Sequence, residues 1–258
     1  MISRLQLILC MQLTLLVRVF AQGPPILLDK PIMLGANKGT VRTLYKNQEL
    51  KVYDFSTCML EADYNVSNFV ALGTEIPINF FQNSIVVGDL NLMAKVQFYN
   101  YNRIGKTVRL AAKAKQMFAT GKKLETMTLG MGHAMSYLGL LAARESLKLG
   151  TQAELGYYFS PSASHLNFLG AKLGFGIPLL KPVYPVNQVN LYFESEGIFA
   201  QNHLGKNQYG IYLAPGIQYA KKIFTVEASF QFPLGQQFHH LATYERRSSL
   251  LIGGRIII

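Results

Sequence analysis

The sequence predicts an all-β protein, a transmembrane antiparallel up-and-down β-barrel of about 12 strands. Apolar and polar residues alternate one by one from Phe224 to Phe232, and the same period of two recurs over residues 209–219 and 248–258. Residues 22–258 contain no stretch of 18 consecutive apolar residues, which excludes a helical multi-span membrane protein. A soluble sandwich would turn its apolar faces inward, whereas a membrane barrel turns them outward to lipid.

The first 21 residues are expected to be a signal peptide. Arg4 precedes an apolar stretch from Leu5 to Phe20, and Val19-Phe20-Ala21 is a cleavage pattern that would leave Gln22 as the first mature residue. Arg18 interrupts the end of the apolar stretch, so a retained membrane anchor is the alternative interpretation. The predicted location is the bacterial outer membrane.

The composition of the exported chain indicates what holds the domain together and what it could bind. Cys10 leaves with the signal peptide and Cys58 is then alone, so backbone pairing and burial must hold the domain together. Of 25 basic residues, removing Arg4 and Arg18 leaves 23 against 14 acidic ones. Export argues against a nucleic-acid partner for this charge, and anionic lipopolysaccharide or an anionic solute suits the compartment better. The sequence has no Trp, so its 14 Tyr and 16 Phe would have to form the interfacial belts.

Turn signals divide the chain into a lead-in and a barrel. Residues 22–40, rich in Pro and Gly, are expected to be an extended periplasmic lead-in, and residues 41–258 a single barrel domain. The expected strands are 41–47, 55–64, 68–79, 87–100, 106–118, 124–138, 149–160, 166–178, 188–201, 206–220, 222–234 and 246–258.

The connections fit such a barrel when both termini are placed in the periplasm. Tight links at 65–68, 102–105 and 220–222 then fall on the periplasmic side, and the longer links 80–86 and 235–245 fall outside. The link 179–187 is periplasmic but long.

The order of several short motifs resembles a known family. They are Gly88-Asp89-Leu90, Phe118-Ala119-Thr120-Gly121, Gly130-Met131-Gly132, and a closing hairpin of residues 212–219 and 226–234. They are similar to recurring elements of the family named for the meta-pathway of phenol degradation, and the likeness extends from about Val41 to the end. The resemblance implies an outer-membrane transporter barrel that passes small apolar or aromatic molecules, with no agreed catalytic residues. The chain departs from that family in Ala119, where Pro is usual, and outer-membrane barrels commonly end in an aromatic residue rather than Ile258.

Charged residues of the polar faces are expected to line the lumen. We expect a basic wall from two adjacent strands to face an acidic wall about half a turn away, which would set a transverse field for the solute. The alternative is a plugged interior in which the same groups pair as a buried network. The predicted lumen-lining residues are Lys95, Arg109, Lys113, Lys115, Glu194, Glu196, Glu227 and Arg255.

The sequence offers candidates for two other kinds of site, a lipopolysaccharide-binding rim and a hydrolase or metal site. Lys122, Lys123, Arg246 and Arg247 are expected at the outer rim, where cations could hold lipopolysaccharide phosphates. The best hydrolase pair, His133 and Ser136, is spaced to lie on opposite faces of a strand, and the other histidines fall in expected outer loops. We therefore expect no catalytic residues, no metal site and no cofactor.

The sequence thus predicts a non-enzymatic outer-membrane channel for passive passage of a small solute. A non-conducting adhesion or envelope-structure barrel is the second hypothesis, and a lipid-modifying hydrolase is the third. The expected partners are outer-membrane lipid and lipopolysaccharide, the solute, and the barrel-assembly machinery.

Overall fold

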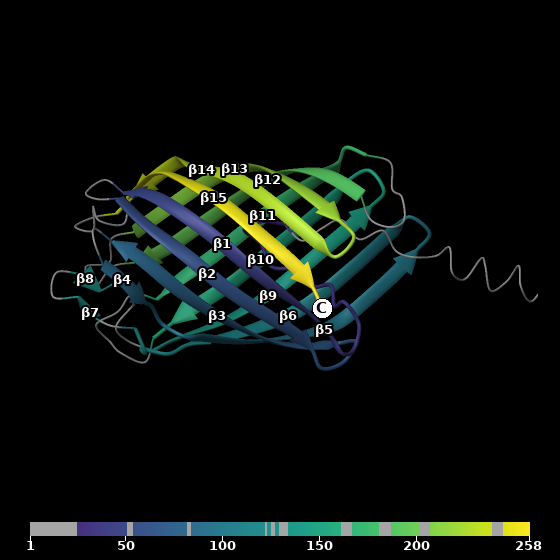
Figure 1. Ribbon diagram of the computed structural model, residues 1–258, viewed down its shortest axis with the longest axis horizontal. Coiled ribbons are helices and arrows are strands. Elements are labelled where there is room, and N and C mark those ends of the chain that lie inside the picture. Colours follow the sequence, from purple (N-terminus) through teal and green to yellow (C-terminus); the bar gives the residue numbers. More distant parts are fainter. Residues whose placement is uncertain are drawn as a thin grey trace, which may run out of the picture.

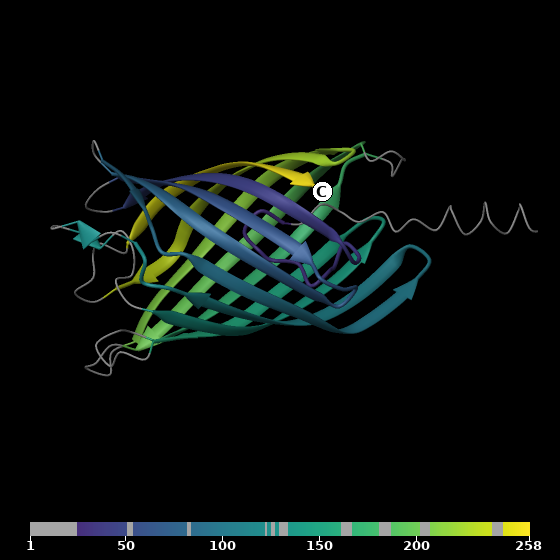
Figure 2. The ribbon, with the colours of Figure 1, turned by 60° about the horizontal axis from the view of Figure 1, so that its bottom comes forward.

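The computed structural model describes residues 25–50, 54–81, 84–121, 123–124, 127–128, 134–160, 167–180, 187–201, 207–238 and 245–258. In these ranges the chain forms strands inclined to a common axis, as Figures 1 and 2 show. The strands are β1 (Lys38–Leu50), β2 (Asp54–Asn65), β3 (Val70–Phe81), β4 (Ser84–Val87), β5 (Asn91–Arg103), β6 (Lys106–Met117), β7 (Lys123–Leu124), β8 (Met127–Thr128), β9 (Met135–Ser146), β10 (Gly150–Phe159), β11 (Phe168–Pro178), β12 (Asn187–Gln201), β13 (Asn207–Lys221), β14 (Phe224–Gln237) and β15 (Arg246–Ile257).

Within these ranges, twelve of the strands form a closed antiparallel ring, which confirms the predicted fold class. Each pairs with its neighbours in chain order, and β1 pairs with β15 from Thr40 opposite Ile257 to Leu50 opposite Arg246. β4 is an extra strand on β3, and β7 pairs with β8 apart from the ring. β1 begins and β15 ends at one end of the ring, which we call the terminal end; the other is the loop end.

Burial along the strands shows which side chains point into the ring and which point outward. On β12, Phe193 is 53% exposed and the next residue, Glu194, is 1% exposed. On β5, Val96 is 45% exposed and Lys95 is 6% exposed. Apolar side chains therefore cover the outside of the ring and polar ones fill it, the reverse of a soluble protein and the arrangement of a membrane barrel. No helix within the described ranges is long and apolar enough to cross a membrane.

Most of the expected strands overlap observed ones, but one was misplaced. A strand was expected over 124–138, whereas β9 occupies Met135–Ser146. The physical reason is that β9 is apolar on both faces: Leu140 and Ala142 point outward, and Leu141 and Ala143 inward. A strand without alternation gives no period-two signal. The tight link 147–149 between β9 and β10 was missed for the same reason.

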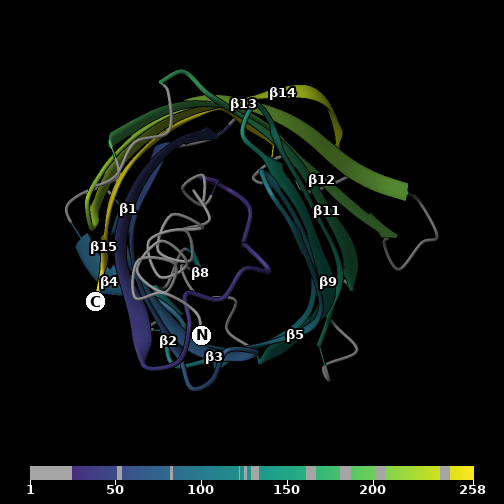
Figure 3. The same cartoon turned by 90° about the vertical axis from the view of Figure 1, so that its right-hand side faces the viewer.

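The start of the described chain lies inside the ring, as the view along the axis in Figure 3 shows. Residues 25–31, here called the inner segment, include Ile26 at 1% and Leu28 at 4% exposure. The expectation that residues 22–40 form a periplasmic lead-in is corrected for this part of the chain, and β1 begins at Lys38 rather than 41. Gly35, with a φ of 103°, and Asn37, with a φ of 59°, turn the chain from the lumen into β1. The expected signal peptide lies outside the described residues.

Candidate functional site: the lumen and the inner segment

Glu194 of β12 binds the main chain of the inner segment. Its carboxylate oxygens accept hydrogen bonds from the backbone N–H groups of Ile26 (3.1 Å), Leu27 (3.0 and 3.2 Å) and Leu28 (3.2 Å). A single charged side chain therefore satisfies three consecutive amides that would otherwise be buried without partners.

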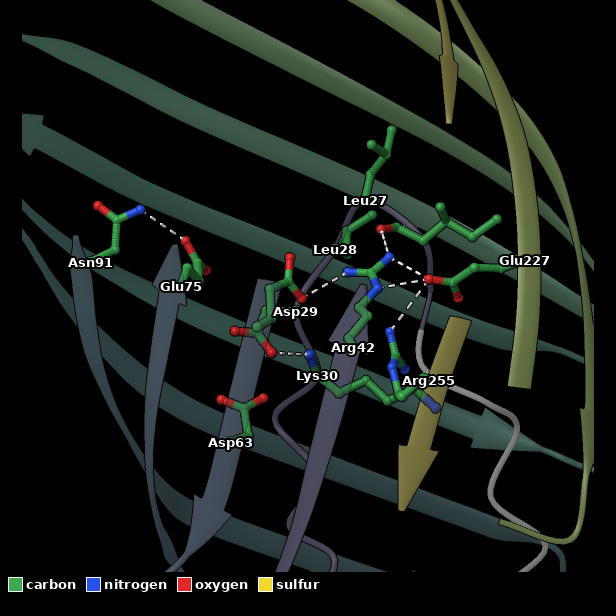
Figure 4. Close-up of polar contacts among 12 residues, drawn as sticks. Leu27, Leu28, Asp29, Lys30, Arg42, Asp63, Glu75, Asn91, Glu227 and Arg255 are labelled. Atoms are coloured by element: carbon green, nitrogen blue, oxygen red, sulfur yellow. Dashed lines mark hydrogen bonds and ion pairs between the residues drawn. The ribbon is translucent and has the colours of Figure 1, made fainter. Parts of the chain in front are cut away.

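Arg42 of β1 joins the inner segment to a second part of the ring, formed by β1, β2 and β14. Its Nη2 donates to the carbonyl oxygen of Ile26 at 2.5 Å, and its guanidinium also contacts Glu227 (2.6 Å) and Glu61 (3.2 Å). Figure 4 shows Arg42 and Arg255 approaching the same Glu227 carboxylate, from which Arg255 lies 3.8 Å away. These charges are buried and mutually compensated, which offsets the cost of removing them from bulk water.

The side chain of Asp29 sits between two lysines of adjacent strands. Its carboxylate lies 2.7 Å from Lys95 Nζ on β5 and 3.1 Å from Lys113 Nζ on β6. Burial by itself would raise the pKa of Asp29, but the two ammonium groups outweigh burial and hold the pKa below its ordinary value. Asp29 therefore stays ionised through mild acid.

Lys30, Leu27 and Leu28 of the inner segment also have specific partners on the strands. Lys30 Nζ lies 2.6 Å from Glu145 on β9, and Lys172 Nζ of β11 donates to the carbonyl oxygen of Leu27 at 3.1 Å. The Leu28 side chain packs over Gly174 of β11, where a Cβ would lie 3.1 Å from its Cδ1. The absence of a side chain at Gly174 thus makes room for the segment.

Three tyrosines, Tyr137, Tyr192 and Tyr212, are buried inside the ring. Tyr137 of β9 is 2% exposed, donates to Glu154 Oε1 at 2.7 Å, and lies over Gly139 and Gly156. A Cβ at either glycine would come within 2.3 Å of the Tyr137 ring or hydroxyl, so both glycines are needed for this packing. Some of the aromatic residues expected in interfacial belts therefore line the interior instead.

The structure places six of the eight predicted lumen-lining residues in ion pairs, namely Lys95, Lys113, Lys115, Glu196, Glu227 and Arg255. Lys113 also contacts Glu154 at 3.4 Å, Lys115 pairs with Glu75, and Glu196 pairs with Arg246 at 3.1 Å. Arg109 lies nearer the terminal end, where it donates to Asn100 of β5. Acidic and basic groups interleave around the ring rather than forming two opposed walls. The arrangement is the paired network that the sequence left open as the alternative.

Several charged residues of this network were missed by sequence reasoning. Those on strands had a usable signal, because Arg42, Glu154 and Lys172 all occupy alternating positions within expected strands. Asp29 and Lys30 gave no signal, since their segment has no strand pattern and their partners are 66 to 115 residues away in the chain.

The rim prediction is corrected for Arg246. Its side chain turns into the ring, where it binds Glu196 and lies 4.7 Å from the centre of the Tyr212 ring. Arg247, the next residue along β15, is exposed. Lys122 is outside the described residues, and Lys123 belongs to β7, where its side chain is not described. A lipopolysaccharide contact by Lys122, Lys123 and Arg247 stays a prediction.

Two motifs of the family resemblance meet at the loop end. The backbone N–H of Gly121 donates to Asp89 Oδ1 at 2.8 Å, and the N–H of Leu90 donates to Thr120 Oγ1 at 2.9 Å. A Cβ on Gly121 would lie 2.9 Å from the same Asp89 oxygen. The motifs Gly88–Leu90 and Phe118–Gly121 therefore form one clasp between the end of the connection into β5 and the start of the connection that follows β6.

The histidines considered for hydrolase and metal chemistry lie outside the described residues. These ranges hold no group of three or more His, Cys, Asp or Glu side chains arranged to bind a metal ion. Ser136 donates to Gln116 at 2.6 Å, whereas all five histidines lie outside the described residues. Cys58 is a half-buried free thiol on the outward face of β2.

Comparisons with known proteins concern the fold. Neither a protein-family model nor a curated protein matches the sequence. An outer membrane channel from Pseudomonas putida F1 matches with a TM-score of 0.65 and 11% identity, over 91% of this chain and 100% of that one. The NanC porin matches with a TM-score of 0.55 and 11% identity, over 84% of this chain and 98% of that one. The chain therefore has a barrel fold that it shares with outer-membrane channels.

Proposed function

We propose that this protein is an outer-membrane channel for the passive passage of a small solute. The observation that carries the proposal is the closed ring itself, apolar on the outside and lined by charged and polar side chains within. The similarity in fold to an outer membrane channel and a porin supports it. In this proposal the terminal end faces the periplasm and the loop end faces outward.

Passage requires the inner segment to move. The segment contacts β1, β5, β6, β9, β10, β11 and β12 and lies across the lumen. Many of its contacts are hydrogen bonds and ion pairs, which can break and re-form, and residues 32–37 connect it covalently to β1. We therefore propose that the segment is a displaceable obstruction and that the structure represents the resting state.

Liposome swelling tests the proposal. Proteoliposomes containing the unmodified chain should swell in small solutes at a rate that falls as solute size rises. The variant Glu194→Leu, which removes the acceptor for three amides of the inner segment, should swell faster. Absence of swelling with both proteins, each shown to be folded by a heat-modifiable band shift, would refute conduction.

The second candidate is a non-conducting envelope-structure barrel. The dense pairing of buried charges around the inner segment favours it, because each pair holds the interior shut. This hypothesis predicts that Glu194→Leu changes the stability of the barrel but creates no permeability, so that neither protein makes the liposomes swell.

From the resemblance to the phenol-degradation family we further propose that the solute is a small apolar or aromatic molecule. Two of the motifs that carry the resemblance, Gly88–Leu90 and Phe118–Gly121, are in contact in the structure. If Lys113 and Lys115 line the solute path, replacing both with Gln should shift the ion selectivity measured in planar bilayers toward cations. An unchanged cation-to-anion ratio would remove both lysines from the path.

A further inference from the structure

The inner segment is bound as a peptide ligand would be, through its main chain first. Three N–H groups are held by Glu194, and the carbonyl oxygens of Ile26 and Leu27 accept from Arg42 and Lys172. None of these contacts depends on the side chains of the segment. Side chains of three different strands thus supply the polar partners that an extended backbone needs.

Side-chain contacts then add selectivity for one pattern. The apolar Leu28 fits over Gly174, the carboxylate of Asp29 lies between Lys95 and Lys113, and the ammonium of Lys30 meets Glu145. The pattern is an apolar stretch followed by one acidic and one basic residue. Main-chain contacts for affinity and side-chain contacts for specificity are the usual division in peptide recognition.

We propose that the lumen is a peptide-binding site, of which the inner segment is the built-in occupant and a short extended oligopeptide of the same pattern is the ligand in trans. The segment and a free peptide compete for one set of wall residues. The site is a property of the folded chain and can be tested in detergent solution. Its role in selecting oligopeptides as the solute rests on the proposed function.

The main experiment uses the full chain carrying Asp29→Asn and Lys30→Gln. These changes loosen the occupant and leave every wall residue intact. The probe is the acetylated and amidated peptide Pro-Ile-Leu-Leu-Asp-Lys-Pro, the sequence of residues 25–31, titrated by calorimetry. A matched peptide with Asn and Gln in place of Asp and Lys is the control.

The native peptide should bind the loosened variant saturably, and the control peptide should bind at least about 30-fold more weakly because two buried ion pairs are lost. The unmodified chain should bind the native peptide at least about tenfold more weakly than the variant does, since the tethered segment competes at an effective concentration on the order of millimolar. Equal affinity for the two peptides, or no binding to the folded variant, would overturn the proposal.

A second measurement needs no substitution. In the unmodified chain, millimolar native peptide should speed amide hydrogen exchange of residues 26–28, because the peptide occupies the wall each time the segment leaves. The control peptide should have no effect, and an equal effect of both would also overturn the proposal. Peptide binding without any liposome swelling would refute conduction but keep the site, whereas swelling without peptide binding would do the opposite.

Discussion

Glu194→Leu tests how the inner segment is held. Leu is close in volume to Glu but accepts no hydrogen bond, so the variant leaves the N–H groups of Ile26, Leu27 and Leu28 without their acceptor. Each buried unpaired donor costs about 1–3 kcal/mol. We use the lower end of that range, about 3 kcal/mol for three donors, because the variant also avoids the cost of burying the Glu194 carboxylate. Every 1.4 kcal/mol is a factor of ten, so the released fraction should rise more than about 100-fold.

The assay is hydrogen exchange of the N-terminal region read by mass spectrometry in detergent, where release of the segment exposes these three amides. Glu196→Leu is the matched control. Glu196 is two residues along the same strand and points into the same lumen, but it binds Arg246 and Gln231 rather than the segment. Exchange should accelerate in Glu194→Leu and not in Glu196→Leu. Equal rates in the two variants would show that Glu194 does not hold the segment.

Three further outcomes are expected. Because the pKa of Asp29 lies below its ordinary value of 3.8, its contribution is complete above that pH and is lost as the pH falls further, so the difference in segment protection between the unmodified chain and Asp29→Asn should be constant from pH 8 to 5 and shrink below 3.8; a difference that already shrinks near pH 6 would contradict this. Arg42→Gln leaves the Glu227 carboxylate with weaker compensation and should lower the free energy of unfolding by about 3 kcal/mol, measured in urea, whereas the exposed Arg247→Gln should change it little. Phe193→Arg, at the middle of β12 on the outward face, should cost about 2–4 kcal/mol in lipid vesicles, and a neutral result would argue against lipid contact there.

The sequence was sufficient for the strands and their closure wherever the two faces differ. Phe224 to Phe232 shows why, since each apolar residue there is exposed or half-buried on the outside and Thr225, Glu227, Ser229 and Gln231 are buried within. β9 could not be placed because its inward Leu141 and its outward Leu140 are equally apolar. Alternation gives no signal over a stretch where the inward side chains are as apolar as the outward ones.

The pairing of the lumen charges could be predicted only in part. Alternation places Lys95, Lys113 and Glu194 inside, but it does not say which charge meets which. That depends on the inner segment, whose Asp29 and Ile26 reach residues that are 66 and 168 positions away in sequence. Such contacts follow from the closed ring and have no counterpart in the short-range pattern.

The positions of the inner segment's partners have a consequence for biogenesis. They are spread over strands from β1 to β12, so the complete set exists only when the sheet has curled far enough to bring distant hairpins face to face. Residues 25–31 are synthesised before every one of those strands, yet they acquire their final surroundings late. An insertion intermediate that has not yet joined β1 to β15 would leave this stretch accessible to protease, which gives a readout for the last step of maturation.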